Sequence, residues 1–124
     1  MGQALVKAVF DTNIVIDLLN GLVEANEELG RYSHVAISRI SWIEVLTGVH
    51  DDEDQNRVES FLAFFEIIEL DEAVSRRAIE LRKQYRLKVP DVIVFASAKV
   101  RNDLLVTRDL NDFPDDDPGV RVPY

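Results

Sequence analysis

Short apolar runs alternate with amphipathic segments along the chain, and this alternation constrains the fold more than any other feature of the sequence. The runs are rich in branched residues and have the length of strands, whereas the segments between them repeat apolar residues every three or four positions, as helices do. The predicted strands are residues 5–10, 34–37, 66–70, 104–106 and 119–122. Strands that alternate with helices predict an α/β protein whose central parallel sheet, of four to five strands, is covered by helices on both faces.

The predicted helices begin near a proline or a polar residue, and several end at a glycine. They are residues 14–21, 22–30, 38–48, a helix from about residue 54, 71–85 and 90–102. The last is ambiguous, because residues 92–96 have the β-branched composition of a strand. Pro90 and Asp91 at its start, and the need for a crossover between parallel strands, favour a buried helix in which burial outweighs propensity.

The size and composition of the chain exclude several classes of protein. The chain has 124 residues, no cysteine and a formal net charge of −9. We expect one domain over residues 1–124, without a disulfide scaffold, a thiol nucleophile or a zinc–thiolate site. No apolar run approaches the roughly 18 to 20 residues of a membrane span, and the first residues lack a signal sequence, so a cytoplasmic protein is expected. The acidic balance argues against bulk electrostatic binding of nucleic acid.

Four acidic residues are predicted to meet at one edge of the sheet. Asp11 follows the first predicted strand directly, and Asp109 follows the fourth strand after two residues. Glu44 and Asp91 lie at or near helix starts, which face the same edge in a parallel fold. Four neighbouring carboxylates cannot all stay ionised without a counter-charge, and oxygen ligands without nearby His or Cys favour Mg²⁺ or Mn²⁺.

Each of these acids also has a purely local interpretation. Asp11 and Asp91 could cap the helices that follow them, and Asp109 could be a turn residue. Residues 41–44 fit a capping box, in which Glu44 would only satisfy a backbone N–H. Asp71 stands in the same context as Asp11 and is interpreted as a helix cap.

The four acids stand within a wider pattern that resembles the PIN-domain family. Its parts are Asp-Thr-Asn at residues 11–13, Glu44, Pro-Asp at residues 90–91 and Thr-Arg-Asp-Leu-Asn-Asp-Phe at residues 107–113. The resemblance covers nearly the whole chain. Within the family, the pattern is most similar to VapC-type toxins of type II toxin–antitoxin systems.

The resemblance implies a small three-layer α/β/α domain, usually a homodimer, that binds Mg²⁺ or Mn²⁺ and cleaves RNA. It implies that Asp11 and Asp91 are the main metal ligands, with Glu44 and Asp109 as the third and fourth catalytic acids. Asp112 is an alternative for the fourth acid. The resemblance also implies supporting roles for the polar residues Thr12, Asn13 and Thr107, and an antitoxin protein as the partner that holds the toxin inactive.

A basic stretch could reconcile an acidic chain with an RNA substrate. Residues 76–88 contain six basic residues and one acid. We predict that part of this stretch, with two arginines near the acids, contacts phosphates; a solvated helix face is the alternative. The candidates are Arg39, Arg82, Lys83, Arg86 and Arg108.

Other functions fit the sequence less well. A receiver-type signalling domain shares the size and an acidic Mg²⁺ pocket, but it has a Lys after the last strand, where this chain has Thr107 and Arg108. A haloacid-dehalogenase-type phosphatase has an acid at the position of Asn13. A non-catalytic PIN-like module usually lacks some of the acids, and a PIN nuclease of RNA processing is the remaining alternative.

An apolar surface is a candidate groove for the helix of an antitoxin. The residues predicted to form it are Trp42, Ile43, Phe61, Phe64 and Phe65. The same side chains would also suit the core or a dimer interface.

Overall fold

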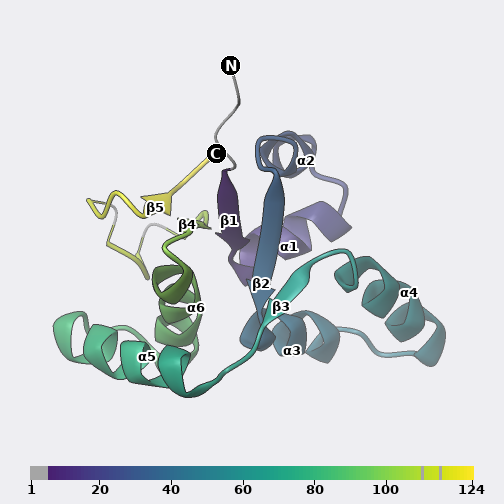
Figure 1. The fold of residues 1–124 in the computed structure, drawn as a ribbon. Coiled ribbons are helices and arrows are strands. Elements are labelled where there is room, and N and C mark those ends of the chain that lie inside the picture. Colours follow the sequence, from purple (N-terminus) through teal and green to yellow (C-terminus); the bar gives the residue numbers. More distant parts are fainter. Residues whose placement is uncertain (1–5, 110, 115) are drawn as a thin grey trace.

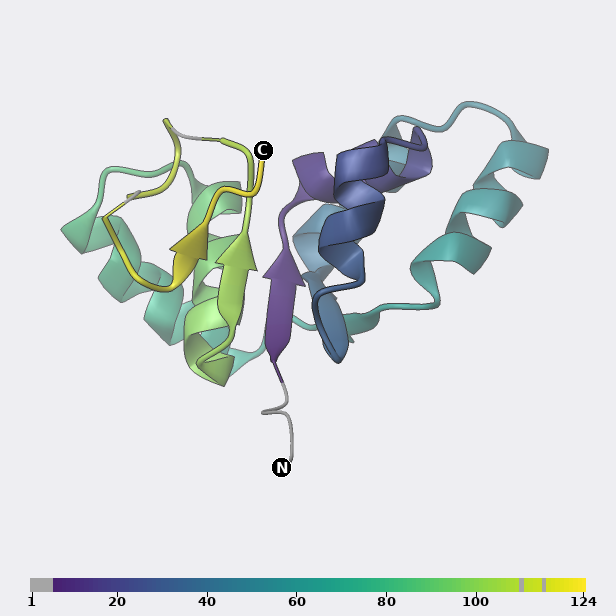
Figure 2. The ribbon, with the colours of Figure 1, turned by 90° about the horizontal axis from the view of Figure 1, so that it is seen from above.

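The computed structural model describes residues 6–109, 111–114 and 116–124, so position 5 of the first predicted strand lies outside the described residues. The strands are β1 Lys7–Phe10, β2 His34–Ser38, β3 Glu66–Ile68, β4 Leu104–Val106 and β5 Val120–Arg121. They form a single sheet in the order β3-β2-β1-β4-β5, and every pairing is parallel. The arrows of β1, β4 and β5 point the same way in Figure 2. The predicted parallel sheet is therefore confirmed, with five strands.

Six helices connect the strands in the described part of the chain, and four of them begin at an Asp or Ser whose side chain caps the helix. They are α1 Thr12–Leu19, α2 Val23–Leu29, α3 Arg39–Thr47, α4 Asp52–Leu62, α5 Glu72–Gln84 and α6 Val89–Arg101. Asp71 caps α5 as predicted, since its carboxylate accepts from the backbone N–H of Val74. Asn102 ends α6 with φ 57°, a left-handed conformation that asparagine tolerates better than most residues.

The sheet separates two hydrophobic cores, because alternate residues of each strand face opposite sides. Val9 and Ala36 pack with buried residues of α5 and α6 on one face. Phe10 and Ile37 pack with buried residues of α1, α3 and α4 on the other. Figure 1 shows α5 and α6 on one side of the strands and α1 to α4 on the other. The protein thus has the predicted three-layer α/β/α architecture.

The ambiguous segment is helical, as predicted. It forms most of α6, where the seven consecutive residues from Val92 to Ala98 are all buried. Such continuous burial arises because α6 lies between the sheet and α5. The tertiary environment therefore outweighs the strand propensity of the Val-Ile-Val-Phe run.

In the described ranges of the chain, no helix has both the length and the apolar character needed to cross a bilayer.

Candidate active site

The order of the strands reverses between β1 and β4, and in parallel sheets such a switch point is where ligands bind. Phe10 and Val106, the last residues of these two strands, are register partners. Asp11 and Thr107 follow them and are both buried. The polar residues that end the two strands are therefore brought together at the carboxyl edge of the sheet (Figure 2).

The carboxylate of Asp11 is fixed from two sides. The Thr107 hydroxyl donates to Asp11 Oδ2 at 2.8 Å, and the Thr12 backbone N–H donates to Oδ1 at 2.8 Å. Asp11 is the residue that caps α1, yet each carboxylate oxygen keeps a free lone pair. The helix-cap interpretation is therefore correct, and it leaves Asp11 able to bind a ligand as well.

Glu44 is joined to the same edge through a hydroxyl. Thr12 Oγ1 lies 2.7 Å from Glu44 Oε1 and 2.8 Å from Ser41 Oγ. Because an ionised carboxylate can only accept, Thr12 donates to Glu44. The capping-box interpretation is wrong, since α3 begins at Arg39 and its cap is Ser38, whose hydroxyl accepts from the Ile40 N–H at 3.1 Å. Glu44 thus accepts a hydrogen bond from α1, through Thr12, and does not cap the start of its own helix.

Asp91 lies in the first turn of α6 and does not cap it. The residue at the cap position is Lys88, whose side chain makes no capping hydrogen bond. Burial, followed by the negative charges of other acids, raises the pKa of Asp91 to about 6. These acids, in decreasing order of effect, are Asp112, Asp11, Asp109 and Glu44. The structure therefore brings all four predicted acids, and Asp112 with them, within electrostatic reach of one another.

Asp109 and Asp112 lie in the loop after β4, and their side chains interact. This interaction lowers the pKa of Asp109 and raises that of Asp112. Asp109 also accepts from the backbone N–H groups of Asn111 and Asp112, at 3.0 and 3.3 Å, which confirms its turn role. The charge of Lys88 lowers the pKa of both acids. Lys88 is a neighbour of the cluster that the sequence analysis did not single out.

Asn13 links the two loops that carry the acids. Its Nδ2 donates to Thr107 Oγ1 and its Oδ1 accepts from the Arg108 backbone N–H, both at 3.4 Å. The Asp109 N–H donates to the same Thr107 hydroxyl at 3.1 Å. The predicted supporting residues are therefore hydrogen-bonded around Asp11 and Asp109.

The five predicted phosphate-contacting residues differ in their surroundings. Arg39 forms a forked ion pair with Glu69, in which Nε lies 2.9 Å from Oε1, and its guanidinium stacks over Trp42 at 4.8 Å from the ring centroid. Arg108 is paired with Asp17. The remaining three, on or just after α5, are exposed, and within the described part of the chain none of them makes an ion pair. These three are Arg82, Lys83 and Arg86.

The donor set suits a hard divalent cation. All the donors are oxygens, and burial together with repulsion from Glu44 and Asp109 raises the pKa of Asp11 to about 6. A divalent cation would relieve this crowding of negative charge. Among the residues described, no three acidic or imidazole groups already converge on one point as a ready-made metal site. The oxygen ligands of the acids therefore suit Mg²⁺ or Mn²⁺. Their carboxylates would have to move closer together to coordinate one ion.

The raised pKa of Asp91 makes a prediction for the metal-free protein. A carboxyl group whose pKa is near 6 when folded and near 4 when unfolded stabilises the folded state at low pH, and this contribution is lost as the pH rises through about 6. We expect Asp91→Asn to raise Tm in chelator by roughly 2–6 °C at pH 7.5 and by less at pH 5.0. Scanning calorimetry at the two pH values measures this, and an equal gain at both would contradict it.

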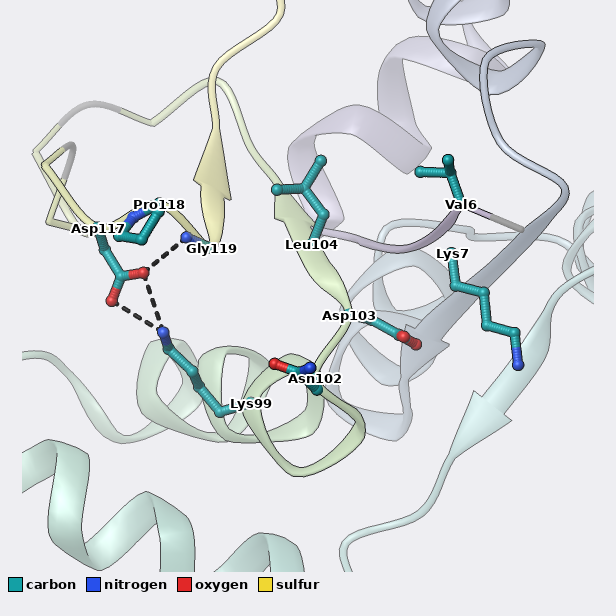
Figure 3. A pocket seen from close by; sticks show the side chains of 9 residues that line it. All are labelled: Val6, Lys7, Lys99, Asn102, Asp103, Leu104, Asp117, Pro118 and Gly119. Carbon is teal, nitrogen blue, oxygen red and sulfur yellow. Dashed lines mark hydrogen bonds and ion pairs between the residues drawn. The ribbon is translucent and has the colours of Figure 1, made fainter. Parts of the chain in front are cut away.

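A separate pocket of about 580 Å³ lies at the opposite, amino edge of the sheet, lined in part by Lys7 and Asn102 (Figure 3). In it, Lys99 Nζ on α6 donates to both oxygens of Asp117 at 2.9 Å. The Gly119 N–H donates to Asp117 at 2.7 Å, and a Cβ on Gly119 would lie only 3.2 Å from Lys99 Nζ. Lys99 and Asp117 are thus paired with each other, and they fasten the loop before β5 to α6.

The protein is thus a three-layer α/β protein with a parallel sheet and a cluster of carboxylates at the switch point between β1 and β4. The chain belongs to the PIN domain family, whose model matches residues 8–115. No curated protein matches the chain significantly. Among solved structures, a toxin–antitoxin complex from Klebsiella pneumoniae contains a similar chain with 40% identity and a TM-score of 0.88, covering 94% of this chain and 98% of that chain.

Two more distant structures share the fold. DNA-bound VapBC from Salmonella typhimurium is 23% identical with a TM-score of 0.78, covering 94% of this chain and 96% of that chain. VapBC2 from Rickettsia felis, bound to a DNA fragment from its promoter, is 22% identical with a TM-score of 0.74, covering 86% and 90%. These two structures show that the fold is shared, and the assignment to the PIN domain family rests on the match over residues 8–115.

Proposed function

We propose that this protein is a metal-dependent endoribonuclease and the toxin of a type II toxin–antitoxin pair. The observation that carries the proposal is the gathering of five acids at the carboxyl edge of the sheet, where the charges of the other four raise the pKa of Asp91. Asp11 and Asp91 would hold Mg²⁺ or Mn²⁺, with Glu44 and Asp109 completing the site and Asp112 beside them. When bound, the metal would supply Lewis acidity and an activated water at a phosphodiester.

The protein's own residues would orient the acids for this reaction. Thr107 and the Thr12 backbone fix both oxygens of Asp11, and the Thr12 hydroxyl aims Glu44 at the same edge. Among the described residues of the cluster there is no histidine or cysteine, so the carboxylates are the groups able to accept a proton from the attacking water. Their fixed orientation lowers the cost of reaching the productive geometry.

The direct test is cleavage of a structured RNA pool by purified protein with Mg²⁺, with Mn²⁺ and with chelator. We expect cutting with either metal and none with chelator, together with Mn²⁺ binding by calorimetry. Cutting that persists in chelator would contradict metal dependence. The absence of both cutting and Mn²⁺ binding would favour the non-catalytic module.

The exposed basic side chains after β3 are proposed to bind the phosphates of RNA. In the same stretch, Arg76 and Arg77 pair with Glu72 and Glu80 of their own helix, which leaves the later residues more available. Replacing Arg82, Lys83 and Arg86 together by Glu should raise KM for RNA at least about tenfold and reduce its salt dependence by about two logarithmic units per decade of salt. Kinetics between 50 and 200 mM salt measure this.

The control variant replaces Arg31 and Arg57 by Glu. Both arginines are exposed; Arg31 lies just after α2, and Arg57 lies on α4. This control should leave KM and its salt dependence unchanged. Because the control reverses two charges and the triple variant three, a control effect about two thirds as large would mean that only net charge matters. An unaltered KM in the triple variant would leave the basic stretch as a solvated helix face.

The antitoxin is proposed to dock between α2 and α4. A groove of about 480 Å³ there is lined by Tyr32, Phe61, Phe64 and Phe65, and Phe64 is 87% exposed. Phe61 and Phe65 make an edge-on contact at 5.4 Å between ring centroids. Trp42 and Ile43, predicted to belong to the same surface, lie on α3 and do not line this groove. The solved relatives come from toxin–antitoxin complexes, which supports an antitoxin helix as the occupant.

We expect Phe64→Glu to weaken binding of the proposed antitoxin, sought as the product of a small neighbouring open reading frame, at least about tenfold, because an exposed aromatic anchor would be replaced by a charge. Co-expression with that protein should relieve growth arrest for the unaltered chain and fail to do so for the variant.

The homodimer implied by the family remains part of the proposal, and light scattering of the isolated protein tests it. A monomer at micromolar concentration would overturn it.

A further inference from the structure

A buried carboxylate behind the acid cluster holds the arginine between Thr107 and Asp109. Arg108 Nε donates to Asp17 Oδ2 at 2.7 Å, and its Nη2 donates to Oδ1 at 3.1 Å. Tyr124 Oη donates to Asp17 Oδ2 at 2.9 Å. The Asp17 side chain is only 11% exposed, whereas that of Arg108 is 45% exposed. Arg108 thus extends from the loop after β4 to Asp17 in the second half of α1.

This ion pair adds a second attachment of the loop to one face of α1. Asn13 and Asp17 are four residues apart in α1 and therefore lie on the same side of the helix. Asn13 binds the Arg108 backbone and the Thr107 hydroxyl, while Asp17 binds the Arg108 side chain. The loop is held at its backbone and at a side chain, immediately before Asp109.

The forked geometry matters more than the charge. A guanidinium that donates two hydrogen bonds to one carboxylate is fixed in both position and plane, whereas an ammonium group is not. The third partner, Tyr124, fixes one oxygen of Asp17 and so limits rotation of the carboxylate. Because both Arg108 bonds go to Asp17, the orientation of the loop depends on a residue that lies outside the acid cluster.

We propose that Asp17 is a positioning residue of the nuclease site, which acts through Arg108 to hold residues 107–109 so that Asp109 faces the other acids. This inference rests on the proposed function. It assigns Arg108 a role in holding the loop, in place of a direct contact with RNA. It also gives the segment after β5 a part in the site, through Tyr124.

The structure offers a matched control with the same three kinds of group. Glu28 accepts from Arg121 Nε at 2.7 Å and from Nη2 at 3.1 Å, and it also accepts from the Tyr32 hydroxyl. Its side chain is 4% exposed and ties α2 to β5. Glu28→Gln therefore disturbs a buried forked ion pair whose side chains make no hydrogen bond to residues 107–109, although the Arg121 backbone oxygen accepts from the Thr107 N–H at 3.0 Å.

The experiment compares Asp17→Asn, Arg108→Lys, the double variant and Glu28→Gln. We expect Asp17→Asn and Arg108→Lys each to lower kcat about tenfold, with KM for RNA and its salt dependence unchanged and Mn²⁺ binding weakened. The double variant should be no worse than either single variant, because both changes break one linkage. Glu28→Gln should leave kcat per folded molecule unchanged.

A second readout does not depend on catalysis. Amide hydrogen exchange at Arg108 and Asp109 should become about tenfold faster in Asp17→Asn, while exchange at Leu105 in β4 stays unchanged. Tyr124→Phe is a milder variant, for use if Asp17→Asn fails to fold, and should accelerate the same amides by a smaller factor. Glu28→Gln should not accelerate them.

Several outcomes would overturn the proposal. If Arg108 contacts RNA by charge alone, Arg108→Lys will keep full activity instead of losing about tenfold in kcat. If Asp17 only supports the fold, exchange will rise throughout the sheet together with that of the loop. Should the unaltered protein neither cut RNA nor bind Mn²⁺, the proposed function fails, and the exchange measurements still decide whether Asp17 holds the loop.

Discussion

Replacing Asp91 by asparagine is expected to lower metal-dependent RNA cleavage by at least about 10³-fold. Asparagine keeps the shape of the side chain and the first turn of α6, but it removes the negative charge that would bind the cation. The partly buried position of Asp91, within the field of four other acids, gives this single charge a large effect. Single-turnover cleavage at saturating Mn²⁺ and calorimetric binding of Mn²⁺ measure the change.

Asp103→Asn is the matched control for this variant. Asp103 follows the other end of α6 and lies at the amino edge of the sheet, beside the pocket that contains Lys99 and Asp117. This control should cut RNA and bind Mn²⁺ like the unaltered protein. Cleavage by Asp91→Asn at more than about a tenth of the normal rate would mean that Asp91 is not an essential ligand.

The largest expected effect on stability comes from Phe95→Ala, which should reduce the free energy of unfolding by about 3–5 kcal/mol. Phe95 is fully buried in α6. Its ring lies 5.7 Å from that of Phe113 in an edge-on contact and 6.1 Å from that of Tyr85, measured between centroids. Removing the ring leaves a cavity between α6, the end of α5 and the loop that carries Asp112. Urea denaturation followed by circular dichroism measures the loss.

Phe95→Leu provides the comparison for the aromatic contacts. Leucine fills more of the space, so the loss should be smaller, at about 1–2 kcal/mol. A loss below about 1 kcal/mol for the alanine variant would show that the neighbouring side chains collapse into the cavity. Since Phe113 is next to Asp112, the alanine variant should also weaken Mn²⁺ binding if it folds.

Much of the fold could be predicted from local patterns. The strands, the helices and the parallel character of the sheet follow from the alternation of apolar runs and helical spacings, although β3 ends two residues earlier than predicted and β5 is shorter. Even α6, with its strand-like composition, was predictable from Pro90 and from the need for a crossover. The meeting of Asp11 with Asp91, Glu44 and Asp109 followed from one rule, the convergence of loops at the carboxyl edge of a parallel sheet.

Local patterns misjudged residues whose partners are distant in the sequence. Glu44 fits a capping box three residues after Ser41, but Thr12 is its partner, 32 positions away. Arg108 has the appearance of a free cation beside an acidic site, yet Asp17 accepts hydrogen bonds from its Nε and Nη2 from 91 positions away. A periodic pattern indicates which face of a helix or strand is buried. It does not indicate which side chains from distant segments contact each other.

The class of fold and the edge where the acids gather could be inferred from the order of residues alone, because hydrophobic periodicity and the direction of parallel strands depend on it. How those acids are held depends on tertiary packing. It joined Thr107 to Asp11, paired Asp112 with Asp109 and tied Arg108 to Asp17. Hydrogen bonds of this kind require donor and acceptor within about 3 Å, and that proximity is set by the packing of α1 against the loop after β4.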